Sequence, residues 1–146
     1  MSDRLNVSSI GDADIAAVVA LWQRCGLVRP WNDAEADIKF ARSGDSSDVL
    51  VGRAGNVIAA SVLVGHDGHR GWVYYVSVDP DFQRREFGRA IMAAAEDWLR
   101  ARGVEKLQLM VRGDNTQVQA FYESLGFGEQ KRVIYAKWLD GRELTP

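Results

Sequence analysis

The stretch Val76–Gly88 constrains this sequence more than any other, because it joins an apolar strand to a basic loop and a helix start. The apolar and aromatic run Trp72–Val78 is typical of a strand, and Asp79–Pro80 interrupts it. Hydrophobic periodicity predicts a helix over 87–102. This order places a helix N-terminus directly after a strand, with a basic loop between them.

The predicted helix start has the chemistry of an anion site. The first N–H groups of a helix have no partners inside the helix, and the helix dipole adds partial positive charge there. Three arginines stand beside these groups, namely Arg84, Arg85 and Arg89. The stretch therefore predicts a site for an anion such as a diphosphate, with solvated loop charges as the alternative role for Arg84 and Arg85.

The spacing of apolar residues along the chain predicts a mixed α/β fold. Expected strands span 4–10, 48–53, 57–64, 72–78, 104–111 and 132–139, and expected helices span 12–26, 32–42, 87–102 and 114–125. The element order is β-α-α-β-β-β-α-β-α-β. Because a helix connects strand 72–78 to strand 104–111, these two should be parallel, whereas the preceding hairpins are antiparallel. A mixed central sheet with helices on both faces follows.

Local signals refine the ends and faces of these helices. Asp12 is expected to cap the first helix. Asn32, with Glu35 three residues later, resembles a capping box for the second. The side chains that the third helix should bury are Phe87, Ile91, Ala94 and Trp98.

Composition excludes several classes of protein. The 146 residues suit one domain over 1–146, with a polar tail at 140–146 that should fray. The net charge of −2 argues against a general nucleic-acid binder, and no apolar run approaches the ~20 residues that cross a bilayer. The N-terminus lacks a signal-peptide pattern, and the single cysteine, Cys25, allows no internal disulfide and is expected to pack rather than react, so a cytoplasmic protein is predicted. Two histidines and one cysteine give no metal-ligand spacing.

Two motifs make the chain resemble the GNAT-type (GCN5-related) N-acetyltransferases over nearly its whole length. The family's acetyl-CoA loop, Gln/Arg-x-x-Gly-x-Gly/Ala, matches Gln83–Gly88, which follows the common Val-Asp-Pro at Val78–Pro80. The family's late helix, Asn-x-x-Ala-x-x-Phe-Tyr-x-x-x-Gly-Phe, matches Asn115–Phe127. One helix and one strand separate the motifs. The resemblance implies the GNAT fold and transfer of an acetyl group from acetyl-CoA to an amine.

The sequence departs from both family motifs. Val118 stands at the alanine position of the second motif, a mild change, and Glu86 stands at a glycine position of the first. That glycine lets backbone amides approach the diphosphate, whereas a carboxylate there would repel it. We expect Glu86 to point outward and to weaken CoA binding without abolishing it.

The resemblance implies a set of residues that hold the cofactor. The backbone amides of Val76 and Val78 would pair with the pantetheine arm as a further strand does, and the Asn115 side chain would bond that arm. An ordinary helix cap is the alternative role for Asn115. The cofactor-binding residues expected in and beside the loop are Gln83, Arg84, Arg85, Glu86, Phe87, Gly88 and Arg89.

Tyr122 is the residue to which the second motif assigns catalysis, and it is also counted among the cofactor contacts. Its phenol, with an ordinary pKa near ~10, can donate a proton to a leaving thiolate whose thiol has a pKa near ~8.5. The alternative role for Tyr122 is packing beside Phe121 on the apolar stripe of its helix.

The general base is not assigned by the sequence. Many relatives carry a glutamate in the strand before the cofactor loop, but strand 72–78 has no carboxylate and no histidine. Deprotonation of the amine would then use water, backbone carbonyls, Tyr74, Tyr75, Ser77 or a residue elsewhere. His66 and His69 flank a turn, where a solvated hairpin tip is favoured over a proton relay.

The acceptor pocket should involve the segment between the first two helices, by analogy with the family. Candidate substrate residues, with two strand tyrosines added, are Trp31, Asp33, Glu35, Tyr74 and Tyr75. Trp31 offers an aromatic face and the carboxylates a charge for an amine, although a helix cap with a packed tryptophan explains the segment equally well.

The sequence thus predicts an N-acetyltransferase acting on a small-molecule amine, a peptide N-terminus or a lysine. A CoA-binding sensor or scaffold without turnover is the main alternative, which Glu86 and the missing strand glutamate favour and Tyr122 disfavours. A nucleotide-binding regulator that uses the same anion loop is a third. A sheet of this order would leave an edge strand near the C-terminus, which would suit a homodimer.

Overall fold

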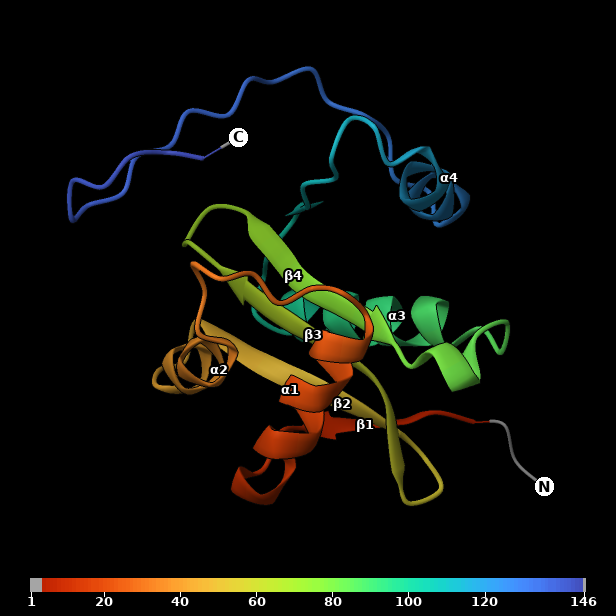
Figure 1. The fold of residues 1–146 in the computed structure, drawn as a ribbon. Coiled ribbons are helices and arrows are strands. Elements are labelled where there is room, and N and C mark those ends of the chain that lie inside the picture. The colour runs from red at the N-terminus through yellow and green to blue at the C-terminus, as the bar shows by residue number, and fades with distance from the viewer. Residues whose placement is uncertain (1–3, 146) are drawn as a thin grey trace. The chain divides into compact units, whose positions relative to one another are not determined.

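The computed structural model describes residues 4–145, and the chain divides into two compact units, Met1–Met110 and Val111–Pro146, each described here by itself. Figure 1 labels the elements. The helices and strands are β1 (Asn6–Ser9), α1 (Ile15–Arg24), α2 (Ala34–Arg42), β2 (Ser47–Ala54), β3 (Val57–His66), β4 (Gly71–Val78), α3 (Phe87–Arg100), β5 (Leu107–Gln108) and α4 (Thr116–Ser124), with short 3-10 turns η1 (Asp12–Asp14) and η2 (Pro80–Phe82).

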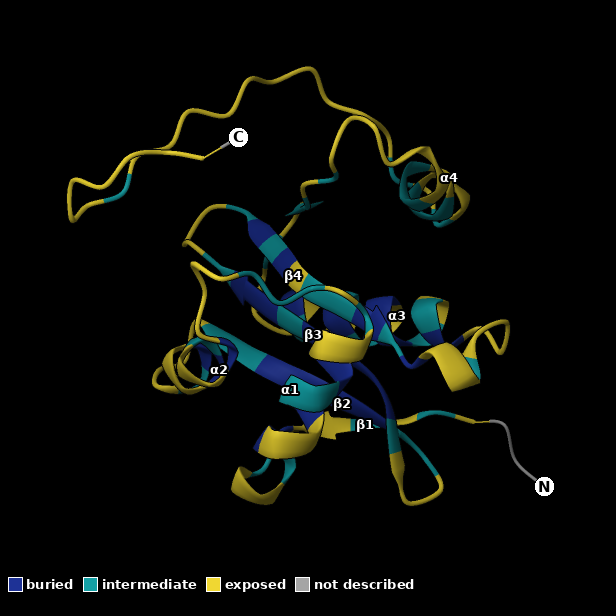
Figure 2. Cartoon of the chain, in the orientation of Figure 1, coloured by how far each residue is buried: buried dark blue, intermediate teal, exposed yellow. Residues whose placement is uncertain are grey.

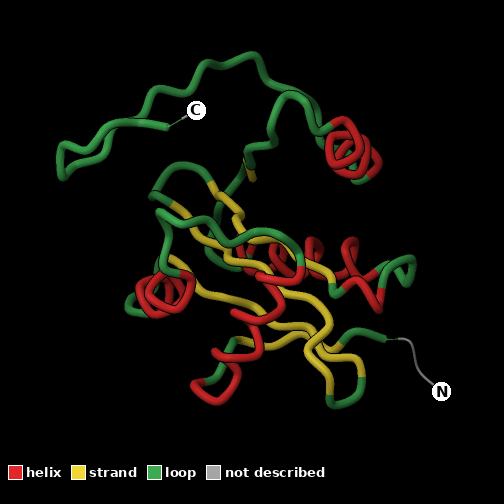
Figure 3. The backbone as a smooth tube through the Cα atoms, in the orientation of Figure 1, coloured by secondary structure: helices red, strands yellow, loops and turns green. Residues whose placement is uncertain are grey.

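The first unit is built on a mixed sheet, which confirms the predicted fold class. Within its described residues the sheet has five strands in the order β1-β2-β3-β4-β5. The first three pairings are antiparallel and the pairing of β4 with β5 is parallel, as a crossover through α3 requires. Helices α1 and α2 cover one face of the sheet and α3 covers the other (Figures 1 and 3).

The core lies along β2 and β3, whose central residues are buried, and includes Val73 and Ser77 of β4 (Figure 2). On one face, α1 buries Val18, Leu21 and Trp22 and α2 buries Ile38, all in one cluster with Val49 and Val51 of β2. The chain forms this layer because the apolar residues of α1 recur at helical spacing while β2 presents every second side chain. The layer fixes α1 and α2 against the sheet.

The buried face of α3 differs from the predicted one. Phe87 and Ile91 are buried as expected, but Met92, Ala95 and Leu99 complete the face in place of Ala94 and Trp98, which are half-buried. Leu99 packs close to Gly71, where an added Cβ would lie 2.6 Å from Leu99 Cδ1. Trp98 lies at the rim of the helix, where the Arg102 guanidinium carbon lies 3.5 Å from its ring centroid. A large amphipathic ring with a cation partner is stable at a rim, so the smaller side chains take the core positions.

Two helix starts differ from the predicted caps. The first helix is preceded by η1, in which the Asp14 carboxylate, not that of Asp12, accepts a bond from Gly11 N at 2.9 Å. The second helix begins at Ala34 with Asp33 as its N-cap, because the Asp33 carboxylate accepts from Ala36 N at 3.0 Å. Aspartate caps a helix as well as asparagine does, so the sequence offered two adjacent candidates.

The second unit contains α4 and an extended C-terminal segment. Asn115 caps α4, since its side chain accepts from Val118 N at 3.1 Å. The predicted strand 132–139 does not form: these residues have no ladder partner in the described part of the chain, and Val133, Ile134 and Tyr135 are exposed. A strand needs a neighbour for its backbone groups, so the predicted C-terminal edge strand is absent. The predicted strand 104–111 shortens to β5.

Among residues 4–145, no helix has both the length and the apolar character that crossing a bilayer requires.

Candidate functional site

The strands β4 and β5 pair over only two residues. Gly71 is opposite Leu107 and Trp72 is opposite Gln108, and the parallel ladder then ends. From Tyr74 to Val78, the edge of β4 that faces away from β3 has no strand partner within the described part of the first unit. Backbone N–H and C=O groups on such an edge are able to pair with an extended ligand.

A β-bulge in β4 precedes this open edge. The register with β3 shifts between Ser61 and Leu63, so that Tyr75 and Val76 together lie opposite Val62. Tyr75 has φ 55, a left-handed value that a bulky residue adopts only where its surroundings hold it. The bulge bends the strand at the residues where β4 and β5 have parted.

The end of β4 directs its backbone groups toward the open edge. Asp79 N donates to Ala59 O at 2.8 Å, so in an alternating antiparallel ladder Val78, one residue earlier, turns its N–H and C=O away from β3. Val78 O accepts bonds from Gln83 Nε2 at 3.0 Å and from the Cys25 thiol at 3.3 Å. The predicted cofactor residue Gln83 thus fastens the loop to the strand end.

The loop after β4 leads into α3 through left-handed residues. Arg84 has φ 67 and Glu86, the N-cap of α3, has φ 63. The bond from Ala90 N to Glu86 O (3.0 Å) opens the helix, so the N–H groups of residues 87–89 precede the first regular intrahelical bond. Alternating backbone handedness before a helix N-terminus forms a concave nest of N–H groups that suits an anion.

The side chains of Arg85 and Glu86 make contacts within the loop and the first turn of α3. The Glu86 side chain is 79% exposed and pairs with Arg89 at 3.1 Å between Oε2 and Nε, which agrees with the outward orientation predicted for it. Arg85 lies over the Phe82 ring, with its guanidinium carbon 5.2 Å from the centroid. The backbone at Glu86 has the conformation that the family's glycine would adopt readily.

Tyr122 belongs to the second unit. Its ring meets Phe121 and Phe127 edge-on, with centroid separations of 5.0 and 5.6 Å. Burial raises the pKa of Tyr122 to about 12, so the phenol is neutral and holds its proton across the physiological range. The geometry is compatible with both roles weighed for Tyr122, and its assignment as general acid stays a prediction, as does that of Asn115 as a pantetheine contact.

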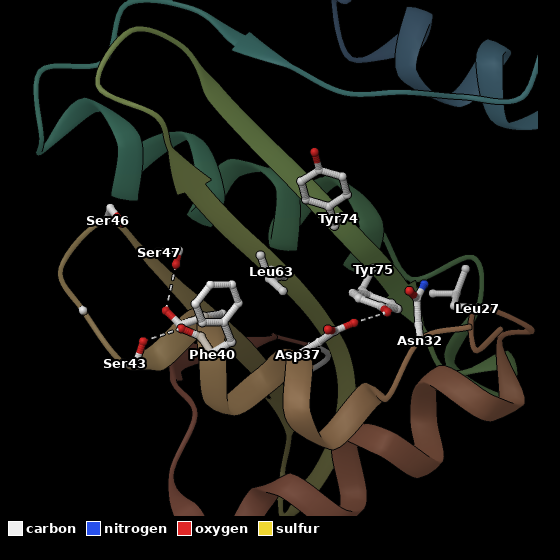
Figure 4. A pocket seen from close by; sticks show the side chains of 12 residues that line it. Leu27, Asn32, Asp37, Phe40, Ser43, Ser46, Ser47, Leu63, Tyr74 and Tyr75 are labelled. Atoms are coloured by element: carbon white, nitrogen blue, oxygen red, sulfur yellow. Dashed lines mark hydrogen bonds between the residues drawn. The ribbon is translucent and has the colours of Figure 1, made fainter. Parts of the chain in front are cut away.

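A cavity of about 620 Å³ opens in the first unit between α2 and strands β3 and β4 (Figure 4). Tyr74 and Tyr75, both predicted substrate residues, line it, and so do Asp37 and Phe40 of α2. Tyr75 Oη donates to Asp37 Oδ2 at 2.7 Å, and the Tyr75 ring stacks on Trp22 with centroids 3.9 Å apart. The lining of the cavity therefore contains a carboxylate–phenol pair whose phenol ring is fixed by its stack on Trp22.

The other predicted acceptor residues lie off this cavity. Trp31 is 44% exposed and Asp33 caps α2. Glu35 pairs with Lys39 at 3.1 Å, both side chains being largely exposed. Of this segment, Asn32 lines the cavity.

The match to known proteins decides the family. The family model described as "Acetyltransferase (GNAT) family" matches residues 15–127. The chain belongs to the GNAT acetyltransferase family. An acetyltransferase of Yersinia enterocolitica is 42% identical to this GNAT chain over 127 residues, which cover 87% of this chain and 90% of the relative.

Solved structures show the same GNAT fold. The ribosomal-protein-S18-alanine N-acetyltransferase of Escherichia coli is 30% identical, with a TM-score of 0.74 over 95% of this chain and 88% of that one. The aminoglycoside N-acetyltransferase AAC(6')-Iy, solved with a CoA-containing bisubstrate analogue, has a TM-score of 0.79 at 19% identity over 92% of this chain and 98% of that one. These likenesses confirm the GNAT-like fold that the sequence predicted.

In this GNAT chain, Tyr74 and Tyr75, the two tyrosines considered as general bases, are in their neutral form. Burial, and then the bond to Asp37, raises the pKa of Tyr75 far above its ordinary value, and burial also raises that of Tyr74. The Ser77 hydroxyl is buried and donates to Ser61 O at 3.3 Å. None of these three groups is therefore free to take a proton from an ammonium near neutral pH.

The two histidines lie at the opposite end of β4 from the loop Gln83–Gly88. His66 ends β3 and His69 lies in the following turn, before β4 begins at Gly71, whereas the loop follows Val78. An eight-residue strand spans roughly 25 Å, too far for direct proton transfer. His66 Nδ1 instead accepts from Gly68 N at 3.1 Å, which favours the structural role.

Sequence reasoning missed Asp37, although a local signal was present. Asp37 follows the buried Ala34 by three residues and precedes the buried Ala41 by four, so it shares the inward face of α2. A carboxylate on a buried helix face is uncommon and marks a position to inspect. Among residues 4–145, no group of three or more His, Cys, Asp or Glu side chains is arranged to hold a metal ion.

Proposed function

We propose that this GNAT protein transfers the acetyl group of acetyl-CoA to a primary amine. The observation that carries the proposal is the succession of two features: the unpaired edge of β4 is followed, after the short turn η2, by the N–H nest at the start of α3. An extended arm that ends in a diphosphate matches this sequence of backbone groups. The family membership supports the same ligand.

The described residues fit CoA. The outward N–H of Val78, with that of Val76 one alternation earlier, would pair with the amides of the pantetheine arm. The N–H groups of residues 84–89 would face the diphosphate, and Arg84, Arg85 and Arg89 would balance its charge. Gln83 supports this arrangement by holding the loop to Val78 O.

The proton balance of the reaction supports a role for Tyr122 as general acid. Acetyl-CoA would supply a thioester, whose acyl carbon bonds to the amine nitrogen while the carbon–sulfur bond breaks. Tyr122 Oη would give its proton to the departing sulfur. A nitrogen that begins as ammonium loses two protons in all, of which one restores Tyr122 and the other is released to solvent. The raised pKa of Tyr122 supports this role, because it keeps the phenol in the acid form.

We further propose that both units act together as one cytoplasmic enzyme domain. The family match over 15–127 spans the boundary at Met110, and the proposed cofactor loop and acid lie on opposite sides of it. The single cysteine of the chain suits a reducing compartment.

A second function, a CoA-binding module without turnover, is favoured by two observations. Glu86 places a negative charge in the loop beside the nest, and β4 has no acidic side chain to serve as a base. Such a module would bind CoA and release no thiol from acetyl-CoA in the presence of any amine.

The test separates binding from turnover. Isothermal titration with CoA should show one saturable site, and ATP should compete poorly because it lacks the pantetheine arm that β4 would pair with. Thiol release from acetyl-CoA should rise above the hydrolytic background with at least one member of a panel of primary amines. Binding of CoA without amine-dependent thiol release would replace the transferase with the binding module. Comparable affinities for ATP and CoA would refute both.

A further inference from the structure

We propose that Asp37 and Tyr75 bind the ammonium group of the acceptor, and that their cavity selects amines whose remaining body is apolar and uncharged. The inference rests on the proposed function and specifies the substrate class of the same protein. Figure 4 shows the two side chains pointing toward one another in the cavity lining, Asp37 from α2 and Tyr75 from the bulge of β4.

The hydrogen-bond inventory of the pair leaves acceptors for a cation. Tyr75 donates its one hydrogen to Asp37 Oδ2, which leaves the lone pairs of the phenol oxygen able to accept. Asp37 Oδ1 has no hydrogen-bond partner, and Asp37 has no ion pair, among the described residues. An ammonium group has hydrogens enough to serve both oxygens at once.

The charge of the lining defines the rest of the acceptor. Among the 12 residues that line the cavity, Asp37 is the one that carries a formal charge at neutral pH. An acceptor with a carboxylate or phosphate would find no cation in this lining and would be repelled by Asp37. Cavities of this volume, about 620 Å³, hold small organic molecules.

Aromatic surface beside the pair suits an apolar body. Phe40 is 82% exposed and Tyr74 is 44% exposed, and both border the cavity. Leu27 and Leu63 add aliphatic walls. Aromatic faces next to a carboxylate attract organic cations, because the ring quadrupole and the anion act in the same direction.

The support behind Tyr75 indicates preorganisation. The ring stacks on the buried Trp22 at an interplanar angle of 1°, and the backbone holds φ 55 at the bulge. A phenol fixed in this way presents its oxygen to the cavity without first losing side-chain freedom. This arrangement makes Tyr75 a positioning group for Asp37 as well as a contact for the cation.

Two probes with the same ring and amine test the selectivity. Binding of 2-phenylethylamine and of phenylalanine, which adds a carboxylate, is measured by isothermal titration in the presence of CoA. We expect 2-phenylethylamine to bind at least about tenfold more tightly. Asp37→Asn keeps the shape of the side chain and an oxygen that can accept from Tyr75. It should weaken the binding of 2-phenylethylamine by roughly tenfold to a hundredfold and reduce the ratio of the affinities for 2-phenylethylamine and phenylalanine.

Control variants isolate the site from general effects of charge and stability. Asp97→Asn makes the same charge change on α3, on the other face of the sheet, and should leave both affinities within about twofold. Tyr75→Phe keeps the stack on Trp22 and removes the hydroxyl, so it should weaken 2-phenylethylamine several-fold. The affinity for CoA should be the same in all four proteins, which verifies the fold.

Each result decides the inference. Equal binding of the two probes, no binding of either, or an unchanged preference in Asp37→Asn would overturn it. If the preference is found but no amine supports thiol release, the cation site stands and the transferase proposal fails. If amines are acetylated but Asp37→Asn behaves like Asp97→Asn, the transferase proposal stands and the cation site fails.

Discussion

The Arg24 guanidinium ties the end of α1 to the residue that follows β4, with Nη2 lying 2.6 Å from Asp79 Oδ2. Asp79 is buried, and its other oxygen accepts from Asp81 N at 2.9 Å, which starts η2. One carboxylate therefore joins a helix, the end of a strand and the entrance to the proposed cofactor loop.

Removing Arg24 should destabilise the protein because it leaves the buried Asp79 carboxylate without its cation. We expect Arg24→Ala to lower the free energy of unfolding by about 1–3 kcal/mol, the lower part of the range reflecting the partial exposure of Arg24. Urea denaturation measures the change. As a control, Arg100→Ala removes exposed ion pairs with Glu96 and Asp97 and should cost less than about 0.5 kcal/mol. Equal losses in the two variants would contradict the structural role of the Arg24–Asp79 pair.

Glu86 is predicted to weaken CoA binding through its charge, its backbone conformation or both. Glu86→Gly should stabilise the fold by up to about 1 kcal/mol, since glycine adopts φ 63 without strain. It should also tighten CoA binding several-fold. Glu86→Gln separates the causes, because it removes the charge and keeps the strained backbone. If repulsion dominates, both variants tighten CoA binding at low salt and the gain shrinks as ionic strength rises. Equal CoA affinities in the three proteins would remove Glu86 from the cofactor site.

Tyr122→Phe tests the proposed general acid. The variant keeps the edge-on contacts with Phe121 and Phe127, so CoA affinity should stay within about twofold. Turnover should fall by roughly a hundredfold or more. With a pKa of about 12, the phenol stays protonated as pH rises, so a rate decline below about pH 10 should be absent or belong to another group. Phe127→Leu, which loses packing but keeps the hydroxyl, should retain turnover. Unchanged turnover in Tyr122→Phe would leave Tyr122 as a packing residue.

Asp14 should make stability depend on pH in the acid range. Its carboxylate accepts from Gly11 N and pairs with Arg53, and these bonds lower its pKa below 3.8. A lowered pKa in the folded state gives stability that is present above the ordinary value and is lost as pH falls through the folded value. Asp14→Asn should therefore cost about 1–2 kcal/mol at pH 7 and progressively less toward pH 2. A cost that is constant from pH 7 to pH 2 would contradict the assignment.

The parts of the fold that the sequence predicted are those with local causes. Strands β2, β3 and β4 follow from short, largely apolar runs bounded by turn residues, and α3 follows from helical spacing. The segment 132–139 has the alternation expected of a strand, but a strand also needs a partner, and pairing is not a local property. The burial of Met92 in place of Trp98 likewise depends on which part of the helix meets the sheet.

The candidate site likewise has a part that could be predicted from the sequence and a part that could not. The loop Gln83–Gly88 and the start of α3 are contiguous in sequence, so their chemistry could be predicted from composition and order. Asp37 and Tyr75 are 38 residues apart and meet only because α2 packs on β2 and β3, the strands beside β4. The bulge at Tyr75 had no signal, since no glycine stands there to mark a left-handed residue.

The bond from the Cys25 thiol to Val78 O bears on how the activity can be assayed. Burial raises the pKa of this thiol, and it is the one cysteine in the chain. At neutral pH the native protein therefore offers almost no thiolate to Ellman-type reagents, whose colour comes from thiolate attack. Free CoA can be counted without a cysteine-free background variant. A rapid, stoichiometric colour change from the protein alone would indicate that the contact between Cys25 and Val78 at the end of β4 is broken.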